Sequence, residues 1–337
     1  MLRYTTLLFF CFLFISFTSL AQHIEVLQQE KSASIRGLSV VDDNVAWISG
    51  SKGTTAITKD GGKTWDWQQV KGFEKADFRD IEAFSAREAV IMSSGSHALI
   101  LKTTDGGQNW KVKYSNTDTA YFFDAMDFTD RFHGYVLGDP INNKFVLMET
   151  KNGGDTWSTF KNCPNAITGE AAFAASGTCL RVDKNRLNIV TGGTQSRVLE
   201  YSINSNLWDY WPLPIASGKA SQGAFSFSRA TSESSKVFIG GDYADDHKTD
   251  SVAAYLPLHS NSIKLANQGP AGFQSCVEYI SGNTFLSTGT PGSNLTTDGG
   301  KTWSKIDDAS YNVCRKAKHG KLVLLAGNGG KIGIFKP

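Results

Sequence analysis

The sequence predicts an all-β protein, and three observations lead to this class. Glycine is abundant and proline scarce, with 33 and 8 among 337 residues, which suits tight turns between strands. The 21 phenylalanines and 8 tryptophans favour strands over helices. One segment rich in glycine and ending in tryptophan recurs along the chain. Its period of roughly 45 residues is long enough for four short strands and their turns, so repeated four-stranded sheets are expected.

Residues 1–21 are predicted to be a signal peptide. Arg3 precedes the apolar run Leu7–Ile15, and Ser19 and Ala21 are small residues at the positions that a signal peptidase reads. The run is short for a membrane-spanning helix of about 20 residues, although a retained anchor is the competing interpretation. We therefore expect cleavage between Ala21 and Gln22 and a secreted or periplasmic protein without a membrane span.

The charge is nearly balanced, with 34 Lys and Arg against 32 Asp and Glu. This balance argues against a strongly basic nucleic-acid binder and against an acidic disordered tail. We expect no nucleic-acid partner.

The recurring segment reads Thr-x-Asp/Asn-Gly-Gly-x-Thr/Asn-Trp, at Thr58–Trp65, Thr103–Trp110, Thr150–Trp157 and Thr296–Trp303. The Asp or Asn side chain can accept hydrogen bonds from the backbone of a turn, glycine supplies positive φ, and tryptophan can cover the turn. The residues at these positions are therefore expected to be structural: Asp60, Asp105, Asn152, Asp298, Trp65, Trp110, Trp157 and Trp303.

A second marker, a β-rich run that ends in glycine, occurs seven times. The glycines are Gly50, Gly95, Gly138, Gly192, Gly241, Gly289 and Gly327. We expect residues 22–337 to form a single seven-bladed β-propeller of four-stranded antiparallel blades. Only one strand, Lys331–Phe335, follows Gly327, so His23–Gln29 is expected to supply the missing strand and close the ring. A six-bladed ring with one irregular blade is the alternative.

The recurring segment is similar to the Asp-box of bacterial neuraminidase repeats. Five further segments extend the similarity: Ser34–Val40, Asp77–Ile81, Gly138–Pro140, Gly169–Gly177, which is expected to open the fourth blade, and Gly240–Ala244. Together they resemble exported bacterial propellers related to the photosystem II stability/assembly factors of plastids and cyanobacteria. The resemblance covers essentially the whole chain after residue 21. It implies a seven-bladed fold and, for the photosynthetic members, a chaperone-like role in assembling a membrane complex.

One face of the expected propeller gathers the candidate binding residues. The start of each innermost strand and the turn after each second strand share this face, which carries both charge signs and aromatic groups. The residues expected to contact a protein or peptide partner of the cell envelope are Arg36, Arg79, Asp139, Glu170, Asp242 and Tyr243. We refer to these six residues as the predicted face. The protein is expected to be a monomer.

Two other functions compete with partner binding. A carbohydrate-active enzyme or lectin of the sialidase type would use an arginine cluster, but Ile35–Gly37 departs from the sialidase motif and no complete arginine triad can be assigned. Some relatives are called oxidoreductases, yet no dinucleotide, redox or haem motif supports that name. We therefore expect no catalytic residue, no cofactor and no metal, and interpret the oxygen-rich stretch Asp242–Asp250 as a polar loop rather than a calcium site.

Four cysteines remain once residues 1–21 are removed: Cys163, Cys179, Cys276 and Cys314. Their number allows two disulfides in an exported protein, but spacing cannot pair them. Buried free thiols are the other possibility.

Overall fold

The computed structural model describes residues 22–95, 97–229 and 235–337. The predicted signal peptide, residues 1–21, lies outside them. Almost all of the regular structure in these ranges is strand, with the short 3-10 turn Asn328–Gly330 as the exception. In the same ranges no helix is long and apolar enough to cross a membrane. The predicted all-β class is confirmed.

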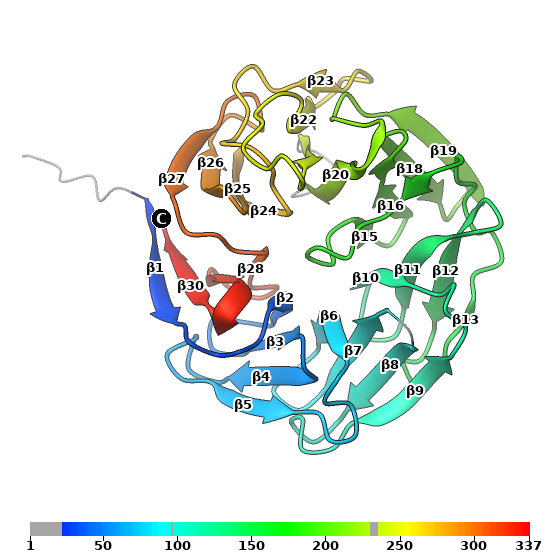
Figure 1. Cartoon of the computed structure of the whole chain (residues 1–337), viewed down its shortest axis with the longest axis vertical. Coiled ribbons are helices and arrows are strands. Elements are labelled where there is room, and N and C mark those ends of the chain that lie inside the picture. Colours follow the sequence, from blue (N-terminus) through cyan, green and yellow to red (C-terminus); the bar gives the residue numbers. More distant parts are fainter. Residues whose placement is uncertain (1–21, 96, 230–234) are drawn as a thin grey trace, which may run out of the picture.

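The described strands form seven antiparallel sheets arranged around a common centre (Figure 1). Sheet 1 contains β2 (Ile35–Val40), β3 (Ala46–Gly50), β4 (Thr54–Thr58) and β5 (Asp66–Gln69). Sheet 2 contains β6 (Asp77–Ala83), β7 (Ala89–Ser94), β8 (Ala98–Thr103) and β9 (Lys111–Asn116). Sheet 3 contains β10 (Phe123–Phe128), β11 (Gly134–Ile141), β12 (Lys144–Thr150) and β13 (Ser158–Thr159).

The remaining sheets follow the same plan with one irregularity. Sheet 4 contains β15 (Leu180–Val182), β16 (Arg186–Val190), β18 (Arg197–Ser202) and β19 (Leu207–Pro212). Sheet 5 has six strands: β14 (Glu170–Ala171), β17 (Gly192–Gly193), β20 (Lys219–Ser228), β21 (Lys236–Asp242), β22 (Ala253–Leu256) and β23 (Lys264–Leu265). Sheet 6 contains β24 (Cys276–Ser281), β25 (Thr284–Gly289), β26 (Gly292–Thr296) and β27 (Ser304–Asp307).

Sheet 7 combines both ends of the described chain. It contains β28 (Val313–Lys316), β29 (Val323–Ala326), β30 (Ile332–Lys336) and the N-terminal strand β1 (His23–Gln28). The strands β1 and β30 pair antiparallel, with Ile24 opposite Phe335 and Glu25 opposite Ile334. This pairing links two segments about 300 residues apart in sequence, a long-range contact that is costly in loop-closure entropy.

One sequence prediction about the strand order is wrong. The stretch that begins at Gly169 and Glu170 does not open the fourth sheet, because β14 pairs with β17 and belongs to sheet 5. The innermost strand of sheet 4 is β15, which pairs with β16. Residues 172–179, between β14 and β15, run instead toward the centre of the ring (Figure 1).

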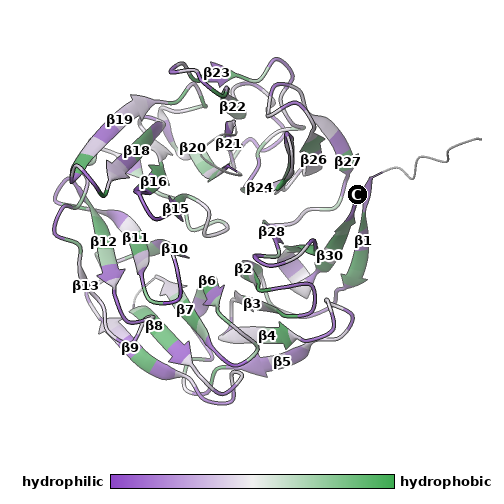
Figure 2. Ribbon diagram, turned by 180° about the vertical axis from the view of Figure 1, so that it is seen from behind, coloured by the Kyte–Doolittle hydropathy of each residue, from purple (hydrophilic) through white to green (hydrophobic). Residues whose placement is uncertain are grey.

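The core lies between neighbouring sheets. Every residue of β3 and β8 is buried, whereas β9 and β5 on the outer edge are partly or fully exposed. Figure 2 shows the same contrast between hydrophobic β8 and hydrophilic β5. Strands buried on both faces carry continuous apolar runs, whereas edge strands keep polar groups toward water.

The Asp-box turns are held by their own side chains. At the first copy, Asp60 accepts hydrogen bonds from the Thr64 backbone N–H at 2.9 Å and from the Thr64 and Thr58 hydroxyls at 2.6 and 2.8 Å. The bonds from Thr64 lower the pKa of Asp60 to about 2. Trp65 Nε1 donates to the Gly62 carbonyl at 3.0 Å. Corresponding side-chain bonds hold the turns at Asp105, Asn152 and Asp298, and Trp303 is buried.

Candidate functional site

A central pocket of about 1130 Å³ opens at the end of the ring where the innermost strands finish. Its wall includes residues from the later halves of β2, β6, β10 and β15 and from β24 and β28. The first and third strands of a sheet run parallel, so the Asp-box turns after the third strands lie on this same side. The predicted face, at the other ends of these strands, lies on the opposite side of the ring.

The lining of the central pocket is strongly charged and carries an excess of cations. Nine Lys and Arg side chains line it: Arg131, Arg181, Lys184, Arg186, Arg229, Lys236, Arg315, Lys316 and Lys318. Six carboxyl groups line it: Asp80, Glu82, Asp127, Asp130, Asp183 and Glu278. A concave site with an excess of positive charge attracts anionic groups. The low-dielectric wall of the site focuses the field of the cations that line it.

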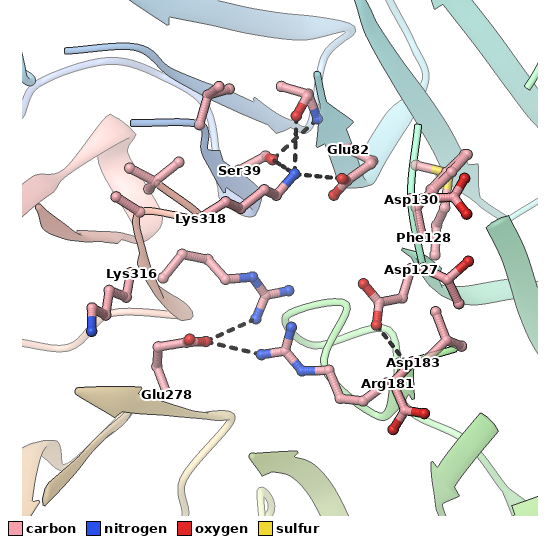
Figure 3. A pocket seen from close by; sticks show the side chains of 18 of the residues that line it. Ser39, Glu82, Asp127, Phe128, Asp130, Arg181, Asp183, Glu278, Lys316 and Lys318 are labelled. Atoms are coloured by element: carbon pink, nitrogen blue, oxygen red, sulfur yellow. Dashed lines mark hydrogen bonds and ion pairs between the residues drawn. The ribbon is translucent and has the colours of Figure 1, made fainter. Parts of the chain in front are cut away.

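Two arginines share one carboxylate in the wall. Glu278 on β24 accepts a hydrogen bond from Arg181 Nη2 at 2.9 Å, and Figure 3 shows these two side chains together. Glu278 also lies 4.0 Å from Arg315 Nη1. Burial opposes the charge of Arg181, but Glu278 and Asp127 hold its pKa above the ordinary value. Burial raises the pKa of Glu278 while the two arginines lower it. One carboxylate cannot saturate two guanidinium groups, so donors remain for an incoming anion.

The opposite part of the wall is acidic. Glu82 is paired with Lys318, whose ammonium group also donates to Ser39 Oγ at 3.2 Å and to the Ala83 carbonyl at 2.9 Å (Figure 3). Asp127 accepts from the Val182 backbone N–H at 2.7 Å. Burial raises the pKa of Glu82 and of Asp127. The central pocket therefore offers hydrogen-bond donors for an anion on one wall and carboxylate acceptors on the other.

Asp80 is the most deeply buried carboxyl of the pocket. It is 1% exposed and accepts from the backbone N–H groups of Met126 at 2.7 Å and Ile81 at 2.9 Å. Burial raises its pKa to about 7, although Arg315 acts in the opposite direction. This carboxyl joins sheet 2 to sheet 3 and titrates near neutral pH.

Residues 172–179 form a plug that crosses the ring. The backbone carbonyls of Ala175, Ala174 and Ser176 accept hydrogen bonds from Arg36, Arg79 and Arg315 at 3.3, 3.5 and 3.1 Å. The ring of Phe173 stacks on Phe225 with centroids 3.8 Å apart. Arg36, Arg79 and Phe225 sit at register shifts of β2, β6 and β20, and such bulges redirect side chains. The plug is thus bonded to Arg36 and Arg79 of the predicted face and to Arg315 of the central pocket.

The plug depends on Gly177. Its φ is +67°, and a Cβ at this position would lie 2.1 Å from Asp80 Oδ2. Gly177→Ala should therefore cost about 1–3 kcal/mol of unfolding free energy, through a left-handed backbone and a clash with Asp80. Urea unfolding of the variant measures this loss. Gly72→Ala is a matched control, because Gly72 has φ +84° but open space around its Cβ; equal losses in the two variants would contradict the role of the clash.

The structure places Arg36 and Arg79 against the plug. Arg79 forms an ion pair with Asp77 at 2.7 Å and lies over the Phe122 ring. Arg36 has no carboxylate partner among the described residues, and burial and the nearby Arg79 lower its pKa. Both side chains are partly exposed.

Three carboxyls of the predicted face have internal partners. Asp139 accepts from the Ala172 backbone N–H at 3.2 Å, and burial raises its pKa. Glu170 is buried and pairs with Arg197 at 2.5 Å. Asp242 is buried and accepts from Gln222 Nε2 and the Ala244 N–H, both at 3.0 Å.

Tyr243 is the most exposed member of the predicted face. Tyr243 is 54% exposed. Its ring packs edge to face against the rings of Phe225 and Phe273. The structure thus brings Arg36 and Arg79 together at the plug and Tyr243 to the surface over sheet 5. Contact of these residues with a partner stays a prediction.

Sequence reasoning missed the pocket residues Arg181, Glu278 and Arg315. Each lies inside an innermost strand, within the runs Leu180–Val182, Val277–Tyr279 and Cys314–Lys316. A signal was present, because a charge within a buried apolar strand needs a partner.

The four described cysteines are free. Within the described ranges no group of three or more His, Cys, Asp and Glu is arranged to hold a metal ion.

Comparisons with known proteins agree with the repeat and the fold. The family model for photosynthesis system II assembly factor YCF48 matches residues 18–118, and the model for the BNR/Asp-box repeat matches residues 295–305. A curated relative, photosystem II assembly lipoprotein Ycf48 from Synechococcus sp. (strain CC9902), is 26% identical over 137 residues. That match covers 40% of this chain and 38% of the relative.

Solved structures share the fold at low identity. YCF48 bound to D1 peptide has a TM-score of 0.64 at 15% identity and covers 95% of this chain and 97% of its own. YCF48 from Cyanidioschyzon merolae has a TM-score of 0.68 at 15% identity, covering 94% and 99%. A catalytically inactive virginiamycin B lyase from Staphylococcus aureus with Quinupristin has a TM-score of 0.67 at 12% identity, covering 94% and 99%. The chain thus carries a BNR/Asp-box repeat, shares the fold of these solved structures and resembles photosystem II assembly factors.

Proposed function

We propose that this protein is an exported assembly factor that captures an extended segment of a client protein in the central pocket. The observation that carries the proposal is the pair Arg181 and Arg315 sharing Glu278 in a cavity with excess cations. A carboxylate of the client would bind their free donors. The similarity to a YCF48 structure bound to a peptide supports this class of partner.

The proposal includes the architecture that presents the pocket. We propose that the seven sheets are blades of one closed ring, with β1 completing sheet 7, and that the protein acts as a monomer in the cell envelope after loss of residues 1–21. Pairing of β1 with β30 supports closure, because it holds the first and last described strands in one sheet.

The six residues of the predicted face are the alternative contact region that we propose for the same function. The exposed aromatic side chain of Tyr243 favours them, because such groups anchor peptide partners. Substituting Asp139, Glu170 or Asp242 would remove internal bonds, so Tyr243→Ala is the cleaner probe of this face.

Peptide binding can be measured with fluorescein-labelled octapeptides rich in Asp and Glu. Replacing both Arg181 and Lys316 by Gln should weaken binding at least about tenfold, because it removes two cations from the pocket and leaves polar, uncharged side chains in their place. Tyr243→Ala is the control and should bind as the wild type does. Melting curves check that both variants fold.

The central pocket and the predicted face predict opposite results for peptide binding by the two variants. Loss of binding in Tyr243→Ala with normal binding in the pocket variant would move the site to the predicted face. If the folded wild type binds none of the peptides and retains no protein from envelope extract, peptide capture is contradicted.

A further inference from the structure

Two buried cysteines on neighbouring innermost strands contact each other where two sheets meet. Cys276 opens β24 in sheet 6, and Cys314 lies on β28 in sheet 7. The Cys276 sulfur lies 3.3 Å from the Cys314 carbonyl oxygen, and the Cys314 sulfur lies 3.7 Å from the Leu286 carbonyl oxygen on β25. Each sulfur thus reaches toward the other sheet. Both residues are fully buried.

The surroundings favour thiolate chemistry at Cys276. Arg315 Nη1 lies 3.8 Å from its sulfur, and the Thr178 hydroxyl lies 3.9 Å from it. Burial acts to raise the pKa of Cys276, but the hydrogen bond from Cys314 and the charge of Arg315 lower it. Burial holds the pKa of Cys314 high. In the folded protein the Cys276 thiol is therefore the more acidic of the two.

We propose that Cys276 and Cys314 form a disulfide that ties sheet 6 to sheet 7 when the chain folds in the presence of a disulfide oxidant. Before the sheets pack, one of the two thiolates, for example that of Cys276, attacks the S–S bond of an oxidant such as oxidised glutathione and releases one glutathione thiolate. The Cys314 thiolate then attacks the Cys276 sulfur and releases the second. The two cysteines lose two protons and two electrons, and the oxidant becomes two thiols.

Burial of the two cysteines determines at which step of folding the thiol–disulfide exchange occurs. Folded sheets close the pair from solvent, so the exchange precedes the packing of sheet 7 on sheet 6. The link would bridge 38 residues, a loop whose closure should raise the melting temperature by about 5 °C. It would also fasten the sheet in which β1 and β30 meet. This inference does not depend on peptide binding.

Refolding the reduced chain, residues 22–337, tests the proposal. One portion refolds with oxidised and reduced glutathione, and another with reduced glutathione alone. Free thiols are then blocked with iodoacetamide in denaturant, and peptides from non-reducing digestion are identified by mass spectrometry. We expect a peptide linked through Cys276 and Cys314 in the first portion, label on Cys163 and Cys179, and a melting temperature about 5 °C above that of the second portion.

Two results would overturn the proposal: label on both Cys276 and Cys314 after oxidative refolding, or linkage of either one to Cys163 or Cys179. The variant with both Cys276 and Cys314 replaced by Ala should melt at the same temperature in the two buffers. Cys163→Ala is the matched control and should keep the difference, because Cys163 has no cysteine neighbour in its hydrogen bonds. Linkage in the wild type decides the matter even where the double variant does not refold.

Discussion

Raising the pH from 4 to 8 should lower the free energy of unfolding by on the order of 4 kcal/mol through Asp80 alone. Burial raises the pKa of this carboxyl from 3.8 to about 7 in the folded protein. Between these two values the folded chain binds a proton that the unfolded chain has lost. Stability therefore falls as pH rises through this window and becomes level above it.

The difference between wild type and Asp80→Asn isolates this contribution, because Glu82, Asp127 and Glu278 also have raised pKa values and remain in both proteins. Urea unfolding at steps of pH gives the two stability curves. We expect the free energy of unfolding of Asp80→Asn, relative to that of the wild type, to rise steadily between pH 4 and 7.

Asp60→Asn is the control of opposite sign. Hydrogen bonds from Thr64 lower the pKa of Asp60 to about 2, so its stabilising effect is complete above pH 4 and is lost only in stronger acid. The difference between wild type and Asp60→Asn should stay constant from pH 4 to 8. A constant difference for Asp80→Asn as well would contradict a raised pKa at Asp80.

The repeats and the class could be read from the sequence because the information is local. In the Asp-box, the residues that bond, Thr58, Asp60, Thr64 and Trp65, lie within eight positions of one another. Local hydrogen bonds of this kind fix a turn wherever the segment occurs.

The fourth sheet could not be placed this way. Its innermost strand, Leu180–Val182, has three residues and no marker, and Glu170, which follows Gly169, resembled a strand start. Only the pairing of β14 with β17 in another sheet decides its position.

The partners of charged side chains also could not be predicted from local sequence patterns. Glu170 was predicted at an open face, but Arg197, 27 positions later, buries it. The pocket residues Arg181 and Glu278 are 97 positions apart. A charged residue on a strand looks the same in the sequence whether water or a distant partner satisfies it, so burial depends on the assembled ring.

Removing the shared carboxylate of the pocket should be the most damaging single change. Glu278→Ala leaves Arg181 and Arg315, with side chains 23% and 11% exposed, without their common partner. Breaking a buried ion pair by deleting one member costs about 3–5 kcal/mol. Glu278→Gln should cost less, because the amide oxygen can still accept a hydrogen bond from Arg181.

Glu200 offers a matched comparison, because it too is shared by two cations of the pocket lining. It pairs with Arg186 at 2.6 Å and Lys236 at 2.7 Å, but the Arg186 side chain is 48% exposed. Water can replace a partner at such a position, so Glu200→Ala should cost less than Glu278→Ala. Urea unfolding of the three variants at pH 8 compares them.

The same variants connect stability with capture of an anion. Glu278→Gln removes one negative charge beside Arg181 and Arg315, so acidic octapeptides should bind it more tightly than they bind the wild type, by about tenfold. A folded Glu278→Gln protein that binds these peptides more weakly would show that the arginine pair serves the fold and not the client. The Glu278 carboxylate stabilises the empty pocket wall, but it also competes with an incoming anion for the donors of Arg181 and Arg315. Tighter peptide binding together with lower stability is therefore the result expected of an anion-binding site.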